Sequence, residues 1–176
     1  MFKTERNNAL ALCLIVLLLV GCGAGASEQA PSDETGLRLV PTTDALSVDE
    51  AGDVEIHLDN VGNLYGLQLH VQFDPTKLQV QDADQAQEGV QIAPGVLPAP
   101  DFAVRNVVDN ERGTIEYAVI QLHPRQPAQG SGVVATIHFQ GVSTGASPLT
   151  LQQVKLADPD GHELPVQLLD ARFQVN

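Results

Sequence analysis

Apolar and polar side chains alternate strictly in Leu67-Gln68-Leu69-His70-Val71-Gln72-Phe73, which is followed at once by Asp74-Pro75-Thr76-Lys77-Leu78. A period of two is typical of a β-strand with one buried face and one solvated face. The Asp74-Pro75 pair ends this strand, because proline fixes φ and has no N–H to donate to a sheet. Leu78 then begins a second strand that returns to the core. This stretch predicts two successive strands joined by a tight turn.

The same alternation recurs in the rest of the chain. Further strands are predicted at residues 37–40, 54–58, 102–108, 114–122, 133–140, 149–156 and 166–175. Turn-forming residues at 109–113 and 158–161 separate neighbouring runs, whereas residues 82–100 lack sustained alternation and are predicted to form a loop. No segment keeps a helical period for three turns. About nine strands within residues 37–176 predict an all-β domain built as a two-layer sandwich.

The N-terminus has the features of a secretory leader. Lys3 and Arg6 precede an apolar run over residues 9–20, which is shorter than the roughly 20 residues that a membrane-spanning helix needs. The run ends in Leu19-Val20-Gly21-Cys22, which resembles the lipobox of bacterial lipoproteins; an ordinary leader with a chance cysteine is the alternative. Residues 1–21 are therefore predicted to be a lipoprotein signal peptide. The resemblance implies that Cys22 is acylated and anchors the protein in the bacterial membrane.

Residues 22–36 are predicted to be the acylated cysteine followed by a flexible tether, because they include no large apolar side chain that a core could bury. The domain would then face the periplasm or the cell exterior. The other cysteine, Cys13, leaves with the leader, so no disulfide is expected.

The charge balance limits the classes of partner. The chain has 9 Lys and Arg against 22 Asp and Glu, a net charge of −13. Such acidity argues against nucleic acid as a partner and against a domain that lies flat on an anionic membrane. Acidity that simply keeps a surface protein soluble is the plainer interpretation.

No catalytic or metal-binding constellation stands out, so the sequence predicts a protein that is not an enzyme and has no cofactor and no metal site. Glu116 lies in the middle of a predicted strand and is interpreted as a surface residue rather than a buried acid. The five histidines lack close ligand spacing. The run Asp158-Pro159-Asp160-Gly161-His162-Glu163 is similar to a calcium loop only superficially, because it lacks the alternating ligands. A tight turn explains it better.

Residues 62–78, 113–118 and 132–139 resemble, in this order, the strands of a cohesin domain, a module of cellulosome scaffolds. The most specific pieces are Phe73-Asp74-Pro75-Thr76-Lys77-Leu78 and the strand that begins Gly132-Val133-Val134-Ala135-Thr136-Ile137. The resemblance covers about residues 37–176. It implies a nine-stranded jelly-roll sandwich, no catalysis, and a protein partner of the dockerin type, carried by a polysaccharide-degrading enzyme.

The resemblance also implies that the partner binds one flat sheet face, which includes the strands matching residues 66–73 and 132–140. The predicted outward residues of that face are Gln68, His70, Gln72, Thr136, His138 and Gln140.

Two alternatives stay open. The first is direct binding of a polysaccharide by the same sandwich, although the chain has no Trp and only two Tyr to stack on sugars. The second is a structural subunit of an envelope complex. In that case, either the outward Gln and His residues or Ile120 and Leu122 would form the contact, because residues 114–122 are apolar on both sides.

Overall fold

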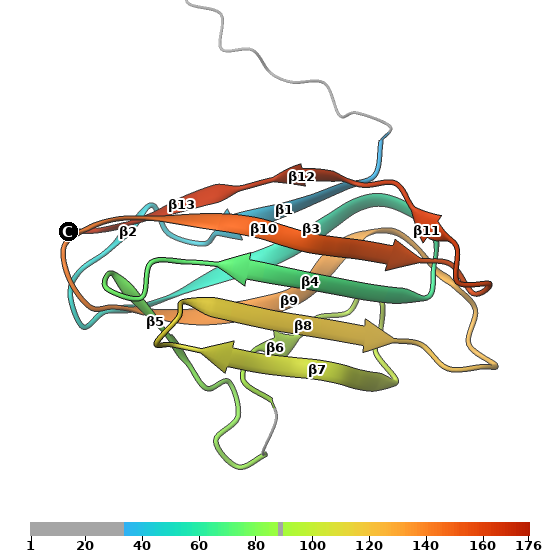
Figure 1. Cartoon of the computed structure of the whole chain (residues 1–176), viewed down its shortest axis with the longest axis horizontal. Helices are drawn as coiled ribbons and strands as arrows, with labels where there is room; N and C mark the ends of the chain where they lie inside the picture. The colour runs from blue at the N-terminus through green and yellow to red at the C-terminus, as the bar shows by residue number, and fades with distance from the viewer. Residues whose placement is uncertain (1–33, 88–89) are drawn as a thin grey trace, which may run out of the picture. The chain divides into compact units, whose positions relative to one another are not determined.

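The computed structural model describes residues 34–87 and 90–176. The predicted leader over residues 1–21, Cys22 and the predicted tether up to residue 33 lie outside the described residues. Contacts within the chain separate Pro31–Asn176 as a compact unit, and this unit contains every described strand (Figure 1). Within the described part of the chain, no helix has the length and apolar character needed to cross a membrane.

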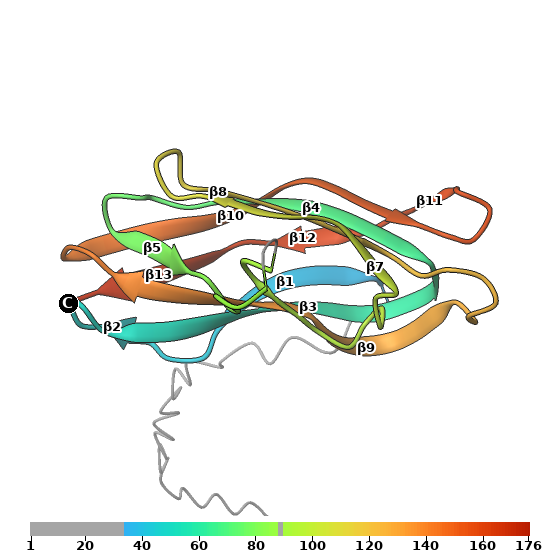
Figure 2. The ribbon, with the colours of Figure 1, turned by 90° about the horizontal axis from the view of Figure 1, so that it is seen from below.

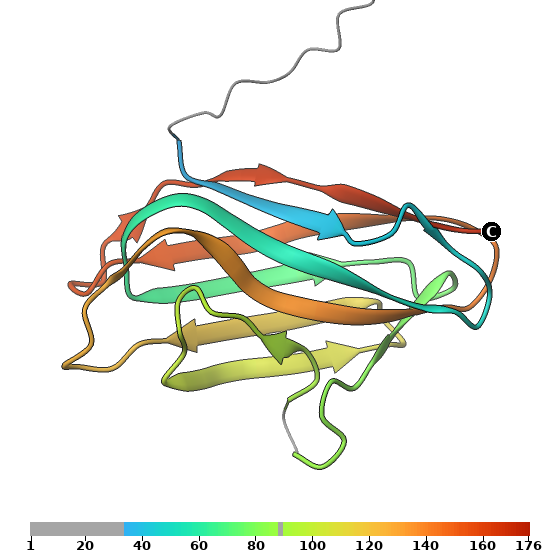
Figure 3. The same cartoon turned by 180° about the vertical axis from the view of Figure 1, so that it is seen from behind.

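The described strands form two sheets that pack face to face, as Figure 2 shows edge-on. The first sheet has the order β12 (Gln167–Leu169), β1 (Gly36–Pro41), β3 (Ala51–Leu64), β9 (Ala128–Gly141) and β5 (Leu78–Gln81), with β6 (Ala93–Pro94) paired to β9. The second sheet has the order β2 (Ala45–Leu46), β13 (Ala171–Val175), β10 (Gly145–Ala157), β4 (Gly66–Gln72), β8 (Thr114–Ile120) and β7 (Phe102–Asp109), with β11 (Glu163–Leu164) paired to β10. Figure 1 is viewed from the side of the second sheet, and Figure 3 from the side of the first.

This architecture confirms the all-β, two-layer sandwich predicted from the alternation. Four of the thirteen strands in the described part of the chain have only two or three residues, and the nine longer ones correspond to the predicted strands. Between residues 82 and 100 the described strand structure is limited to the two-residue β6. The predicted strand at 166–175 is divided at Asp170, where the chain passes from the first sheet to the second and the Asp170 carboxylate accepts a hydrogen bond from the Leu151 N–H.

The core lies between the sheets and is built by the alternation itself. Buried side chains of β3 and β9 in the first sheet meet buried side chains of β4, β8 and β10 in the second. Three aromatic rings of the core pack edge to face: the centroids of Phe73 and Phe139 are 5.3 Å apart, and those of Phe139 and Phe173 are 6.4 Å apart. Such edge-to-face pairs stabilise a core beyond the area they bury.

One prediction about the binding face is wrong. β4 pairs with β8 and β10, whereas β9 pairs with β3, β5 and β6. The two strands therefore belong to opposite sheets. Gln68, His70 and Gln72 point away from the core on one side of the sandwich, and Thr136, His138 and Gln140 point away on the other. These six residues cannot share one flat face.

Candidate functional site

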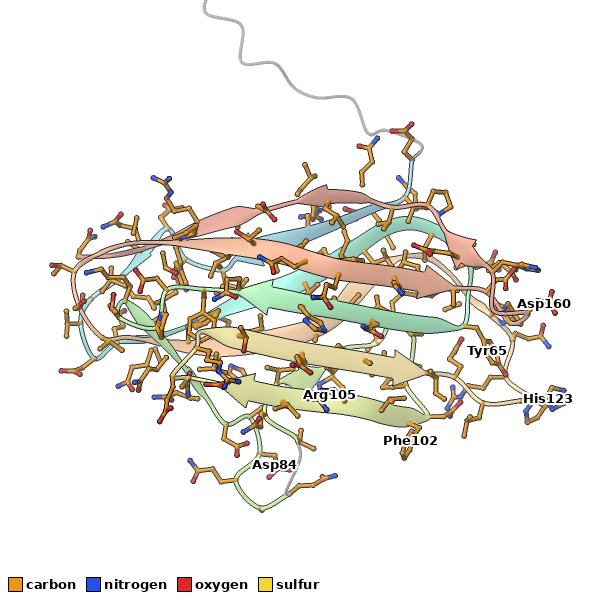
Figure 4. All side chains as sticks on the ribbon, in the orientation of Figure 1. Tyr65, Asp84, Phe102, Arg105, His123 and Asp160 are labelled. Atoms are coloured by element: carbon orange, nitrogen blue, oxygen red, sulfur yellow. The ribbon has the colours of Figure 1, made fainter. Side chains whose placement is uncertain are left out.

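The outer surface of β10, β4, β8 and β7, called here the β4 face, is arranged in rows of side chains across the strands. Residues that are in register across neighbouring strands point to the same side of a sheet. The row at one end consists of Ala157, Gly66, Ile120 and Phe102, and the next consists of Lys155, Gln68, Ala118 and Arg105. The third row is Gln152, His70, Glu116 and Val107, and the fourth is Thr150, Gln72, Thr114 and Asp109. In Figure 4 this face is toward the viewer, with Phe102 and Arg105 labelled on β7.

Large apolar side chains are exposed along β7 on this face. Phe102 is 58% exposed, and Val104 is 56% exposed in a bulge of β7. A shallow depression of about 150 Å³ lies beside Val104 and is lined by Gln68, His70, Arg105, Glu116, Tyr117 and Ala118. Exposed apolar side chains around a hollow are typical of a surface that meets a protein partner.

The loop after β8 borders the same end of the face. Leu122, which is 50% exposed, donates its backbone N–H to the Asp101 carboxylate at 2.9 Å. Arg125 Nε donates to the other oxygen of Asp101 at 2.6 Å. The Leu122 N–H, followed by the Arg125 guanidinium, holds the pKa of Asp101 below its ordinary value. These bonds fix the loop against the start of β7.

The polar residues predicted on β4 differ in how they are bonded. Gln72 donates to the Arg112 carbonyl at 3.0 Å and is therefore part of the fold. Among the described residues, the side chains of Gln68 and His70 have no hydrogen-bond partner. Their polar atoms are therefore available to another molecule.

The opposite surface is formed by β1, β3, β9 and β5 and is called here the β9 face. Polar side chains on this face bond to one another. His138 Nδ1 lies 2.6 Å from Asp53 Oδ1, and Gln140 accepts a hydrogen bond from Gln81 at 2.9 Å. Along β3 the pattern continues, with a 2.6 Å contact between His57 and Glu55. Thr136 lies half-buried between these pairs, in register with Glu55. A partner that took up His138 or Gln140 would have to compete with these bonds.

Two acidic features that the sequence singled out have structural roles. Glu116 is about one third exposed on β8 and pairs with the Arg105 guanidinium, which agrees with its interpretation as a surface residue. Asp158, Asp160 and His162 bring three ligand atoms within 4.8 Å of one another. Asp158, however, already accepts the backbone N–H groups of Asp160 and His162, and the His162 N–H is the main cause of its lowered pKa. The segment is a tight turn, with Gly161 at φ +83°.

Sequence reasoning missed Phe102, Val104, Arg105 and Lys155 as members of the exposed face. The available signal was the run of apolar residues in β7, whose exposure follows from its place at the edge of the sheet. The bulge at Val104 shifts the alternation by one residue, and a period-two pattern does not reveal such a shift.

The chain matches the family model of the Cohesin domain over residues 39–175. The structure is similar to a type II cohesin domain from the cellulosome of Acetivibrio cellulolyticus, with a TM-score of 0.68 and 20% identity over 80% of this chain and 95% of that one. It is also similar to a non-cellulosomal cohesin from the archaeon Archaeoglobus fulgidus, with a TM-score of 0.64 and 16% identity over 81% of this chain and 91% of that one.

A third similar structure is the third cohesin ScaC of Acetivibrio cellulolyticus, solved in complex with the ScaB dockerin. The TM-score is 0.65 and the identity 21%, over 79% of this chain and 98% of that one. No curated protein sequence matches the chain.

Proposed function

Since this chain belongs to the cohesin family of non-catalytic protein-interaction modules, we propose that it captures a dockerin-type module of another protein on its β4 face. The other protein is a polysaccharide-degrading enzyme, and the chain holds it at the bacterial surface. The complex of a similar cohesin with the ScaB dockerin supports a partner of this kind.

We choose the β4 face because the two outer surfaces differ in their exposed apolar side chains and in their hydrogen bonds. On the β4 face Phe102 and Val104 are exposed, and Gln68 and His70 have no hydrogen-bond partner among the described residues. On the β9 face His138 and Gln140 are bonded within the domain. A partner gains apolar burial and new hydrogen bonds on the first surface, whereas on the second it would have to break existing ones.

A sheet face also suits a binding role because its backbone is ordered before the partner arrives. Each strand of the β4 face is paired to its neighbours along its length. Binding therefore costs little backbone entropy, and the loss is limited to long side chains such as Lys155 and Gln68. Of the six residues predicted from the sequence, three belong to the proposed face: Gln68, His70 and Gln72. The other three lie on the β9 face and are not part of the proposed site: Thr136, His138 and Gln140.

A matched pair of substitutions tests the face. Ala118 and Thr136 are both half-buried, outward residues of inner strands, one on each face. We expect at least one member of a panel of dockerin modules to bind the 31–176 fragment in calorimetry. Ala118→Trp should weaken that binding at least about tenfold, or about 1.4 kcal/mol, because the ring would hold the partner away from the face. Thr136→Trp should leave the dissociation constant within about twofold.

Other outcomes would contradict the proposal. Equal losses in both variants would remove the β4 face from consideration. Failure of every dockerin to bind, together with retention of the wild-type fragment on insoluble cellulose or chitin, would favour direct carbohydrate binding. Capture by the cell's own envelope proteins in place of dockerins would favour the structural-subunit alternative.

We also propose that acylation of Cys22 attaches the domain to the membrane and that residues 22–36 act as its tether. The order Leu19-Val20-Gly21-Cys22 supports this proposal. Expression of the full chain in a bacterium should give a membrane-bound protein that incorporates labelled palmitate. Cys22→Ser should abolish the label and move the protein out of the membrane fraction. A membrane-bound, unlabelled wild-type protein would contradict the proposal.

A further inference from the structure

A hollow lined by amide side chains lies outside the β4 face. It has a volume of about 330 Å³ and is lined by Asn63 of β3, Gln129 of β9, and Gln126 and Pro127 of the loop that precedes β9. Among the described residues, the three amide side chains have no hydrogen-bond partner. Each amide carries one acceptor and two donors, so the hollow offers unused polar groups of both kinds. We call it the amide hollow.

The end of β3 departs from regular strand geometry at this hollow. Its pairing with β9 shifts register twice, between Leu58 and Val61 and between Val61 and Leu64. Asn63 lies within the second shift and has φ +60°, a left-handed conformation that asparagine adopts more readily than most residues. Irregularities of this kind re-aim a side chain and are frequent beside functional sites. The amide of Asn63 is therefore presented to the hollow by a local distortion that the alternation does not predict.

A tyrosine ring lies at the same end of the sandwich. Tyr65 follows Asn63 by two residues, where the chain passes from β3 in the first sheet to β4 in the second. Its carbonyl accepts the Gln121 N–H at 2.8 Å, at the start of the loop that precedes β9. Figure 4 shows Tyr65 and His123 of this loop at one end of the domain. The ring is half-buried, whereas Tyr117 is buried, so Tyr65 is the tyrosine that can present a flat apolar ring with a polar tip to another molecule.

The chemistry of the lining selects a neutral, hydroxyl-rich ligand. All four lining residues are uncharged, and the net charge of −13 of the chain repels an anion. A cation would meet amides in place of carboxylates, and a peptide would find Pro127 as its one apolar contact in the lining. A sugar hydroxyl both donates and accepts hydrogen bonds, as an amide does. The hollow therefore fits a glycan without charged groups.

We propose that the amide hollow binds a neutral glycan, whose hydroxyls bond to Asn63, Gln126 and Gln129 and one of whose sugar rings lies against Tyr65. This inference goes beyond the proposed function and does not depend on it. The hollow is separate from the β4 face, so the domain can hold a protein partner and a glycan together. Its volume lies at the lower end of the roughly 300–1,000 Å³ of ligand pockets. We therefore expect a dissociation constant of about 1 mM or below for one domain.

Titration of soluble oligosaccharides into the isotope-labelled 31–176 fragment, followed by NMR, tests the inference. The probes are the neutral hexasaccharides of cellulose, xylan, mannan and chitin, with hexagalacturonate as an acidic comparison. At least one neutral probe should shift the side-chain amide signals of Asn63, Gln126 and Gln129. Because the lining is uncharged, 0.5 M salt should change this affinity by less than about twofold. Hexagalacturonate should bind more weakly than that probe, because the chain repels it.

Substitutions separate the parts of the site. Gln126→Ala combined with Gln129→Ala should weaken binding at least about fivefold, because two hydrogen bonds to the glycan are lost. Tyr65→Ala should also weaken it, whereas Tyr65→Phe keeps the ring and should keep most of the affinity. The matched control is Gln68→Ala, which removes an exposed glutamine amide of the β4 face and should leave the dissociation constant within about twofold. Urea unfolding verifies that each variant is folded.

Three outcomes would overturn the inference. The first is absence of shifts at the amide hollow with every neutral probe at about 10 mM, where a site with a dissociation constant of about 1 mM is about nine-tenths occupied. The second is equal affinity of the double variant and Gln68→Ala. The third is a glycan whose shifts lie on the β4 face and disappear in Ala118→Trp. Dockerin binding tests the proposed function separately, and the double variant should bind dockerins as the wild type does.

Discussion

Asn106 shows how one side chain can hold a long loop. It lies on β7, is 5% exposed, and its Oδ1 accepts the N–H groups of Gln91 and Ile92 at 3.1 and 2.9 Å. Its Nδ2 donates to the Ile92 carbonyl at 2.8 Å. The side chain thus pairs with the loop backbone as a strand would. An asparagine in an apolar strand gives no sign of this role in the sequence, because the partner atoms belong to the backbone of a segment 14 residues away.

We predict that Asn106→Leu destabilises the domain by about 2–3 kcal/mol, because the buried N–H of Ile92 and the part-buried N–H of Gln91 lose their acceptor and the Ile92 carbonyl loses its donor. The free energy of unfolding of the 31–176 fragment in urea measures the effect. Gln129→Ala, at an exposed amide of β9, should change it by less than about 0.5 kcal/mol. A loss for Asn106→Leu no larger than that of the control would show that the loop is held by other contacts.

Tyr117 has a buried hydroxyl with no hydrogen-bond partner among the described residues. It points inward from β8, and burial raises its pKa to about 12. Because the folded protein leaves this polar group unpaired, we predict that Tyr117→Phe raises the free energy of unfolding by up to about 1 kcal/mol. Thermal unfolding of the two proteins at neutral pH checks the sign. A destabilised variant would mean that a bound water or an altered ring position satisfies the hydroxyl.

The sequence predicts the strands and their buried side chains well, but it does not predict which sheet each strand belongs to. The alternation in residues 67–73 and 133–140 predicts correctly that Leu69, Val71, Ile137 and Phe139 are buried. It says nothing about which strand lies beside which, because pairing joins residues far apart in the chain. For this reason the outward residues Gln68 and His138 could be identified while the conclusion that they share one face was wrong.

The hairpin between β7 and β8 depends on one glycine. Gly113 has φ +69°, and a Cβ there would lie 2.2 Å from the Phe73 carbonyl oxygen. Its own carbonyl accepts the Phe73 N–H at 2.8 Å, which joins the hairpin to the end of β4. Both the left-handed backbone and the close approach exclude a side chain.

We predict that Gly113→Ala lowers the free energy of unfolding by at least about 2 kcal/mol, because the left-handed conformation alone costs an alanine roughly 1–2 kcal/mol and the clash adds to it. Gly62→Ala is the matched control, since nothing lies within 4 Å of a Cβ at Gly62 and its φ is not in the left-handed region. Urea unfolding of both variants measures the difference. Equal effects would show that the hairpin adjusts without strain.

The whole molecule balances two opposing electrostatic effects as the pH changes. Its net charge of −13 makes the folded state repel itself at neutral pH, and this repulsion weakens as the pH falls toward the isoelectric point of about 4.5. Four carboxyl groups act in the other direction, because hydrogen bonds in the fold hold their pKa values below the ordinary ones: Glu50, Asp74, Asp101 and Asp158. For Asp74 the main cause is the Thr76 hydroxyl at 2.7 Å, followed by the Thr76 backbone N–H.

A carboxyl group with a lowered pKa in the folded state stabilises the fold fully above its unfolded pKa of about 4, and this contribution is lost as the pH falls through the folded pKa. We therefore predict that the Tm of the 31–176 fragment rises from pH 8 to about pH 5 in low salt and falls below about pH 4. Salt at 0.5 M should raise the Tm at pH 8 more than at pH 5, since it screens the repulsion. Asp74→Asn should make the acid-side fall shallower. A Tm in low salt that is higher at pH 8 than at pH 5 would show that the acidic surface does not strain this fold.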